Sequence, residues 1–86
     1  MIAELRFDQS NLEKHSVTTD EVEDCFLDSA RLDRRIAKDI YWLIARTQAG
    51  RLLQIGYKKE PDNVLFVFHA MNAKTHEQKQ YKRRGK

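Results

Sequence analysis

The sequence predicts an α+β fold, with an antiparallel sheet of three to five strands, two short N-terminal helices and one C-terminal helix. Two observations support this prediction. Apolar residues recur with helical spacing in the segment before Asp28, whereas after Asp28 they alternate within short segments that turn-forming residues separate. Because 86 residues provide only one modest core, we expect residues 1–86 to form a single domain.

The first expected elements are a short strand and a short helix. Ile2, Leu5 and Phe7 alternate loosely and predict an edge strand. Asp8 can then cap the N-terminus of a helix through QSNLEKH, residues 9–15. The histidine that ends this helix follows a lysine, so it is a candidate for either a chemical or a structural role.

The second expected helix has a well-defined start. Thr18 and Glu21 have the spacing of a capping box, and Val17 and Val22 have that of a hydrophobic staple. Val22 begins an apolar stripe that includes Cys25, the only cysteine of the chain. A cysteine on such a stripe behaves as a small hydrophobe, and a lone cysteine forms no internal disulfide, so we expect a reducing compartment.

The segments after Asp28 predict three or four consecutive antiparallel strands. QAG provides one hairpin turn and EPDN a second. The expected strands cover residues 30–36, 40–47, 51–59 and 64–70. A C-terminal helix follows, with Thr75 as N-cap and Gln78 at the third helical position, and we expect it to fray at Gly85.

Charge is distributed unevenly along the chain. Residues 1–28 hold eight acidic and two basic residues, a net −6, whereas residues 29–86 hold fourteen basic and five acidic residues, a net +9. This division indicates one surface for a polyanion and an acidic surface that is kept away from it or binds a basic partner. The sequence has no apolar run near the roughly 20 residues that cross a bilayer and lacks a recognisable secretory signal, so we expect a soluble, cytoplasmic protein with no membrane partner.

Alternation in the strand at residues 40–47 divides its side chains between two faces. One face carries Trp42, Ile44 and Arg46, and the other carries Tyr41, Leu43 and Ala45. Helices must cover one face, and arginine and aromatic side chains at the rim of the other could hold single-stranded nucleic acid by charge and stacking. Individually, however, we expect Trp42, Phe66 and Phe68 to belong to the core.

The spacing of the residues in the sequence gives little support for a metal site or for a catalytic nucleophile. His15, His69 and His76 fit no metal-ligand spacing, no cysteine pair accompanies them, and the isolated glycines form no phosphate-binding loop. We therefore expect no metal and no cofactor. What remains is acid–base or electrostatic catalysis on a phosphodiester. The side chains available for it are Lys14, His15, Arg34, Arg35, Arg46, Arg51, Lys74, His76, Tyr81 and Arg83.

Four separated segments resemble the BrnT toxins, a branch of the RelE-like type II toxin–antitoxin ribonucleases. NLEKHSVTTDEVEDCF resembles their N-x-x-K-H-G-[VL]-x-F-x-E-A-x-x-V-F start, and RLDRR is similar to their arginine-rich central strand. ARTQAGRLLQIGY resembles the G-x-T-x-x-G-R-x-L-x-V-x-Y hairpin, and FHAMNAKTHEQKQYKRR the closing I-S-A-R-x-A-x-x-x-E-x-x-x-Y. The likeness extends from Phe7 to Arg84, with the four motifs in the same order and at similar spacing.

This resemblance implies a RelE-like α+β ribonuclease toxin that cleaves RNA without a metal and inhibits translation. It implies as partners RNA and a cognate small DNA-binding antitoxin, in a homodimer or a toxin–antitoxin hetero-oligomer. His15 would be a proton donor or acceptor, the arginines phosphate ligands, and Glu77 and Tyr81 residues that dock the last helix. The expected catalytic residues are Lys14, His15, Arg34, Arg35 and Arg51. The expected RNA-binding residues are Arg46, Lys74, Tyr81, Lys82 and Arg83.

The chain also departs from the family pattern. Ser16 replaces the glycine after the motif histidine, and Met71 replaces an arginine that is a plausible phosphate ligand. Two alternatives therefore stay open: a non-catalytic module of the same fold that binds nucleic acid or the antitoxin, and a small structural partner protein. A catalytic His15 requires one of the expected catalytic arginines close to it across the sheet.

Overall fold

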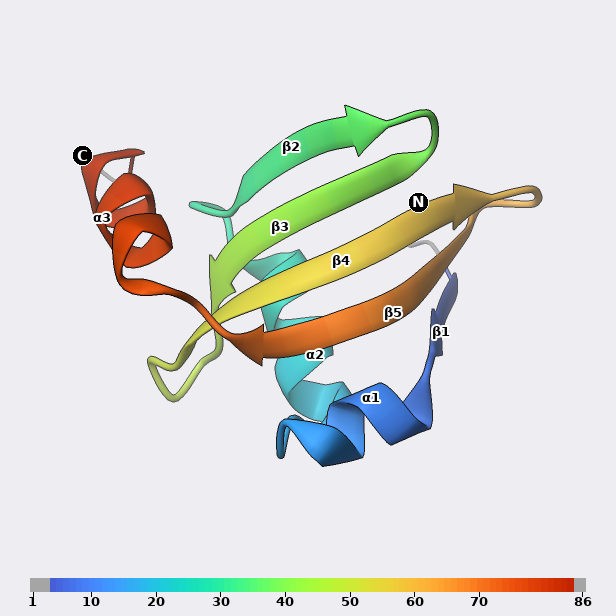
Figure 1. Ribbon diagram of the computed structural model, residues 1–86, viewed down its shortest axis with the longest axis horizontal. Helices are drawn as coiled ribbons and strands as arrows, with labels where there is room; N and C mark the ends of the chain where they lie inside the picture. Colours follow the sequence, from blue (N-terminus) through green and yellow to red (C-terminus); the bar gives the residue numbers. More distant parts are fainter. Residues whose placement is uncertain (1–3, 85–86) are drawn as a thin grey trace.

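A computed structural model describes residues 4–84 and confirms the α+β class, with a five-stranded mixed sheet and helices (Figure 1). The elements are β1 (Glu4–Phe7), α1 (Gln9–Lys14), α2 (Thr19–Leu27), β2 (Leu32–Ala37), β3 (Ile40–Arg46), β4 (Leu52–Glu60), β5 (Val64–Asn72) and α3 (Thr75–Arg84). Ile2 of the predicted edge strand and the predicted fraying at Gly85 lie outside the described residues. Among the helices within residues 4–84, none is long and apolar enough to cross a membrane.

The sheet has the strand order β1-β5-β4-β3-β2. Strands β2 to β5 pair antiparallel in sequence order, as predicted, and Gly50 adopts a φ of 96° in the turn between β3 and β4. β1 pairs with β5 in parallel, so the predicted antiparallel sheet is in fact mixed. Parallel pairing is possible here because most of the chain separates β1 from β5, and such a long crossover can return in the same direction.

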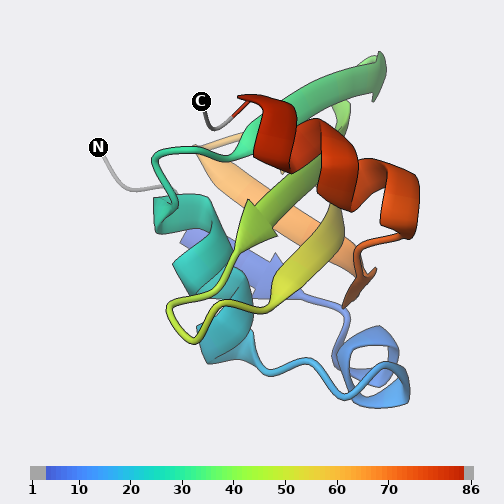
Figure 2. The same cartoon turned by 90° about the vertical axis from the view of Figure 1, so that its left-hand side faces the viewer.

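Helices pack on both faces of the sheet. α2 lies on one face and α3 on the other (Figure 2). We name the face under α2 the covered face, and the face that α3 covers only at one end the open face. Under α2, alternate residues of the central strands form the main core with residues of α1 and α2. This core comprises Leu12, Val17, Val22, Cys25, Leu43, Ala45, Leu53, Ile55, Tyr57, Val67 and Ala70. The alternation predicted for residues 40–47 is thereby confirmed.

On the open face, α3 packs over one end of the strands. Its Tyr81 forms a small second core with Ile44 and neighbouring apolar residues. The expected core residues Trp42, Phe66 and Phe68 are instead only partly buried. The prediction that they belong to the core is therefore wrong, because the single C-terminal helix covers less of this face than α1 and α2 cover of the other.

The helix starts follow the predicted capping pattern with one correction. Thr18 Oγ1 accepts a hydrogen bond from Glu21 N–H at 3.1 Å, and the Glu21 carboxylate accepts one from Thr18 N–H at 3.0 Å, which confirms the capping box of α2. α3 begins at Thr75, one residue earlier than predicted. Glu77 Oε1 accepts from Lys74 N–H at 2.8 Å, so a carboxylate rather than the predicted glutamine satisfies the helix start.

Candidate functional site

A row of four residues crosses the open face from β2 to β5. Arg34 is the Cα partner of Trp42, Trp42 is that of Gly56, and Gly56 is that of His69. Paired residues of neighbouring strands project to the same face of a sheet, so these side chains lie in one line. We call this set the cross-strand row. It combines a cation, a large aromatic ring and an imidazole.

Gly56 provides the space that Trp42 occupies. A Cβ atom at Gly56 would collide with the Trp42 ring and would lie 3.0 Å from Phe68 Cε1. The indole therefore extends over β4 to His69, with ring centroids 5.2 Å apart at an interplanar angle of 64°, and to Phe68 at 6.1 Å. The sequence signal for this arrangement is a glycine in the middle of a strand, which indicates close approach of another group.

A chain of hydrogen bonds connects His69 to α3. His69 Nε2 lies 2.9 Å from Gln54 Oε1, and Gln54 Nε2 donates to Glu77 Oε2. Both Gln54 and Glu77 are only 8% exposed. We name His69, Gln54 and Glu77 the relay. Sequence reasoning missed the roles of His69 and Gln54, although Gln54 interrupts an apolar strand, which is a signal for a polar residue with a specific partner.

His15 ends α1, which lies against β5 where Asn11 Oδ1 accepts a hydrogen bond from Ala70 N–H at 3.0 Å. The His15 ring meets the His69 ring with centroids 5.9 Å apart at 69°. Partial burial lowers the pKa of His69 most; His15 lowers it further, Glu77 raises it, and Lys74 lowers it. Two imidazoles from distant parts of the chain thus meet at the β5 end of the cross-strand row.

Arg51 lies beside His15, but acceptors of the protein surround its guanidinium. Nη2 donates to the His15 carbonyl at 3.5 Å, and Nη1 donates to the Ser16 carbonyl at 3.0 Å and to Glu21 at 3.1 Å. Nε donates to Asn72 Oδ1 at 2.8 Å. One of the expected arginines therefore does lie near His15. Its N–H groups, however, bind the turn between α1 and α2 to α2 and β5. These contacts engage the Arg51 guanidinium within the protein, so it is not available as a phosphate ligand.

Arg34 and Arg35 are consecutive residues of β2 and project to opposite faces. Arg34 lines a cavity of about 140 Å³ between α3 and strands β2 and β3, whereas Arg35 Nε donates to the Ala37 carbonyl at 3.3 Å. The other lining residues are Leu32, Trp42, Ile44, His76, Glu77 and Gln80. Three strand spacings of about 4.8 Å separate β2 from β5, so Arg34 occupies the opposite end of the cross-strand row from His69.

The remaining cations that are expected to bind RNA are all exposed: Lys74, Lys82, Arg83 and Arg46. Lys14, at the end of α1, is also exposed. The guanidinium of Arg46 lies over the Tyr81 ring, 5.4 Å from its centroid. Tyr81 is buried and donates its hydroxyl to Asp28 Oδ2 at 2.6 Å; burial and Asp28 together raise the pKa of Tyr81 to about 12. Tyr81 thus docks α3, and its burial keeps it from stacking with a base of RNA.

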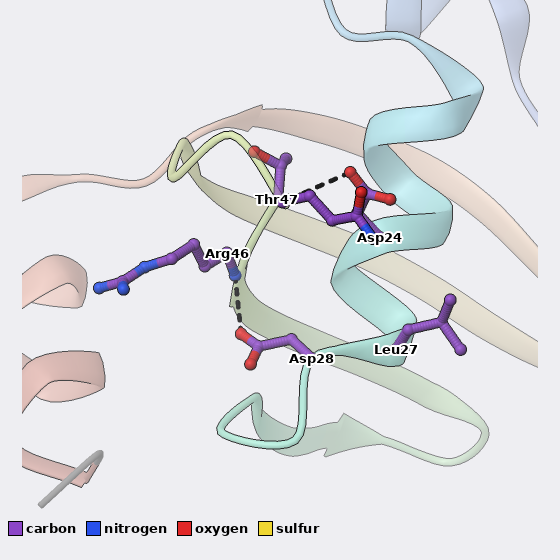
Figure 3. Close-up of a pocket in the computed structure, with 6 residues that line it drawn as sticks. Asp24, Leu27, Asp28, Arg46 and Thr47 are labelled. Atoms are coloured by element: carbon purple, nitrogen blue, oxygen red, sulfur yellow. Dashed lines mark hydrogen bonds between the residues drawn. The ribbon is translucent and has the colours of Figure 1, made fainter.

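A larger cavity of about 220 Å³ lies between α2 and the turn that joins β3 to β4 (Figure 3). Asp24 accepts a hydrogen bond from Gln48 N–H at 3.1 Å, and Asp28 accepts one from Arg46 N–H at 2.9 Å. Leu27, at 74% exposed, lines the same cavity. The carboxylates of Asp24 and Asp28 repel phosphate groups, so this cavity suits RNA less well than the open face does.

Cys25 is fully buried, and burial, with the charges of Asp28, Asp24 and Glu21, raises its pKa to about 12. The thiol therefore stays protonated and packs as a hydrophobe. Within the part of the chain that the structure describes, no group of three or more His, Cys, Asp or Glu side chains is arranged to hold a metal ion.

Comparisons with known proteins leave the family open: no protein-family model matches the chain, and no curated protein matches it significantly.

Proposed function

We propose that the protein is a BrnT-like ribonuclease toxin of a type II toxin–antitoxin pair, with a RelE-like arrangement, and that it cleaves single-stranded RNA on its open face. The observation that carries this proposal is the cross-strand row of Arg34, Trp42, Gly56 and His69, with His15 at its β5 end. It brings charge, a stacking surface and proton-transfer groups together on one partly exposed surface. The ordered motifs between residues 7 and 84 support the choice of family.

Trp42 supports binding of unpaired bases. Proteins recognise single-stranded RNA by stacking its bases on aromatic side chains, often on a sheet, and each stacked base contributes about 1–3 kcal/mol. Trp42 is partly exposed and its ring is fixed between Gly56 and Phe68. Arg34 adds a positive charge at the next strand, where a phosphate of the same RNA strand can bind.

His15 supports the chemical step. Cleavage of RNA by its own 2′-hydroxyl needs one group that takes a proton from that hydroxyl and one that gives a proton to the leaving 5′-oxygen. Imidazole performs either role near neutral pH, so the proposed reaction needs no metal. His15 is partly exposed at the end of the cross-strand row, within reach of an RNA strand that stacks on Trp42.

The test uses the intact protein and single-stranded RNA in the presence of EDTA. We expect cleavage to 2′,3′-cyclic phosphate and 5′-hydroxyl ends, and growth arrest when the protein is expressed in bacteria. His15→Ala should reduce cleavage by about 10²-fold or more and relieve the arrest. Gln48→Ala, which changes an exposed residue in the turn between β3 and β4, is the control and should retain most of the activity. A folded wild-type protein that neither cleaves RNA nor slows growth would contradict the enzyme.

Two observations favour the non-catalytic module as a second candidate. Arg51 is engaged within the protein, and Met71 stands where the family has an arginine, so two of the family's expected phosphate ligands are not available. Such a module should bind RNA with a steep dependence on salt and without cleavage, because phosphate contacts release counterions. RNA binding that is insensitive to ionic strength would argue against both candidates.

A toxin of this kind also needs a cognate antitoxin, which we propose to be a small DNA-binding protein with a basic surface, present with the toxin in the cytoplasm. α2 exposes the carboxylates of Asp20 and Glu23, which offer charge complementarity to such a surface. The adjacent reading frame should encode this protein, and the two should co-purify. A toxin that is purified alone and has no small neighbouring gene would count against the pair.

A further inference from the structure

We infer that His69 is a second catalytic imidazole, the general base of the cleavage step, and that Gln54 and Glu77 are positioning residues that fix its tautomer. This inference rests on the proposed ribonuclease function and adds residues that the motif resemblance did not include. The contacts that carry it are those of the relay and the meeting of the His15 and His69 rings on the open face.

The relay determines which ring nitrogen of His69 is basic. A carboxylate only accepts hydrogen bonds, so the amide nitrogen of Gln54 must face Glu77. The carbonyl oxygen of Gln54 then faces His69 Nε2 at 2.9 Å, and this nitrogen must carry the proton to donate to it. A neutral imidazole has one N–H, so Nδ1 holds the lone pair that can accept a proton.

The relay is also held rigidly. Glu77 is 8% exposed, and its second oxygen accepts Lys74 N–H at 2.8 Å, which links it to the start of α3. Gln54 is equally buried near the start of β4, which lies between β3 and β5. Fixed partners on both sides prevent rotation of the amide, and a general base held in one orientation needs no reorganisation during the reaction.

The charges around His69 favour its neutral, basic form. His15 faces it from α1, Lys74 from the segment before α3, and Glu77 from α3, while Trp42 and Gln54 face it from β3 and β4 without charge. Burial, His15 and Lys74 lower the pKa of His69, and Glu77 raises it. His69 is therefore suited to the role of proton acceptor, and we assign the role of proton donor to His15.

The two imidazoles divide the proton transfers of one step. His69 Nδ1 accepts the proton of the 2′-hydroxyl as O2′ forms its bond to phosphorus. The bond between phosphorus and O5′ breaks, and the imidazolium of His15 gives its proton to O5′. The products are a 2′,3′-cyclic phosphate and a 5′-hydroxyl, and no water or co-reactant is consumed. Ring centroids 5.9 Å apart allow both residues to act on the same phosphodiester, because each nitrogen needs to lie only about 3 Å from its oxygen.

The test combines cleavage kinetics with a measurement that does not depend on activity. His69→Gln should lower the cleavage rate by about 10²–10⁴-fold and leave the affinity for an RNA with a 2′-deoxy cleavage site nearly unchanged. Gln48→Ala, which changes an exposed residue of the turn between β3 and β4, is the control and should cleave as the wild type does. In the wild type, long-range proton–nitrogen NMR correlations should show the Nε2–H tautomer for His69. Wild-type cleavage that His69→Gln leaves intact, or an Nδ1–H tautomer, would overturn the inference while the proposed function stands.

Glu77→Gln separates a positioning role from a structural one. Loss of the carboxylate should allow both tautomers of His69 and move the acid limb of the pH–rate profile to lower pH, because Glu77 raises the pKa of His69. Gln54→Met removes the amide with little change in volume and should have the same effect on the tautomer. If both variants fold and neither changes the tautomer or the acid limb, the relay has no positioning role. A wild type that cleaves no RNA contradicts the proposed function itself.

Discussion

The two faces of the sheet differ in what their side chains do, and neighbouring residues of β3 show the difference. Leu43 projects into the main core and is fully buried, whereas Trp42 projects to the open face and is only partly buried. The strand thus supplies stability with one set of alternating residues and the proposed binding surface with the other. The comparison teaches that the residues we propose to bind RNA are large side chains which the helices leave only partly covered.

The largest expected effect is on the covered face. Leu43→Ala removes a fully buried side chain and leaves a cavity, which should lower the free energy of unfolding by about 2–5 kcal/mol. Chemical denaturation followed by circular dichroism measures this loss. RNA affinity per folded molecule should stay the same. A loss below about 1 kcal/mol would mean that the main core does not carry the stability we assign to it.

Trp42→Ala, one residue away, should have the opposite profile. RNA affinity should fall by about 1–3 kcal/mol, or roughly 5- to 150-fold, because a stacking platform is lost. The free energy of unfolding should fall by less than in Leu43→Ala, because the indole is already partly exposed. Filter binding with single-stranded RNA measures the affinity. Unchanged RNA affinity in a folded variant would remove the open face as the binding surface.

The contacts that hold α3 at one end of the open face should weaken in acid. Partial burial raises the pKa of Asp28, but hydrogen bonds from Tyr81, Arg46 and Ala30 outweigh it and lower the pKa below the ordinary value of 3.8. The folded pKa is below the unfolded pKa, so this stabilisation is present above about pH 4 and is lost as the pH falls through the folded value. Asp28→Asn should cost about 1 kcal/mol at pH 7 and flatten the acid dependence of the denaturation midpoint.

In the Asp28→Asn variant, Glu21 should still make the denaturation midpoint depend on acid pH. Its pKa is also lowered, despite partial burial, by hydrogen bonds from Thr18 and Arg51 and by the Arg51 charge. Asp28→Asn should therefore keep a smaller acid dependence than the wild type. An acid dependence as steep in Asp28→Asn as in the wild type would show that the contact between Asp28 and Tyr81 does not hold α3 in place.

Local patterns in the sequence predicted the secondary structure well, because capping, turns and alternation depend on neighbouring residues. The capping box of Thr18 and Glu21 and the alternation of β3 are examples. The parallel pairing of β1 was not predictable, since it depends on how the whole intervening chain returns to β5. Trp42 was assigned to the core because its size alone favours burial, whereas its exposure depends on the limited extent of α3.

The candidate site was predictable in part, for the same physical reason. Sequence patterns indicated His15 and Arg34 as residue types suited to phosphodiester chemistry, but they contain no information on distant partners. The contact of His15 with His69 and the engagement of Arg51 by Glu21 join segments that only the folded sheet brings together. Two arginines of similar appearance in the sequence therefore differ: Arg51 is held by the protein, and Arg34 is exposed.

The smallest expected effect distinguishes the two faces by charge alone. Arg34→Gln and Arg35→Gln remove the same charge from adjacent residues of β2 that project to opposite faces. Neither should change the free energy of unfolding by more than about 0.5 kcal/mol, because both residues are exposed. Arg34→Gln should weaken RNA binding several-fold and reduce the salt slope of log K by about 1, since one phosphate contact is lost. Arg35→Gln should bind as the wild type does at all salt concentrations. Equal losses in the two variants would mean that RNA responds to the overall charge of the protein and is not bound on one face.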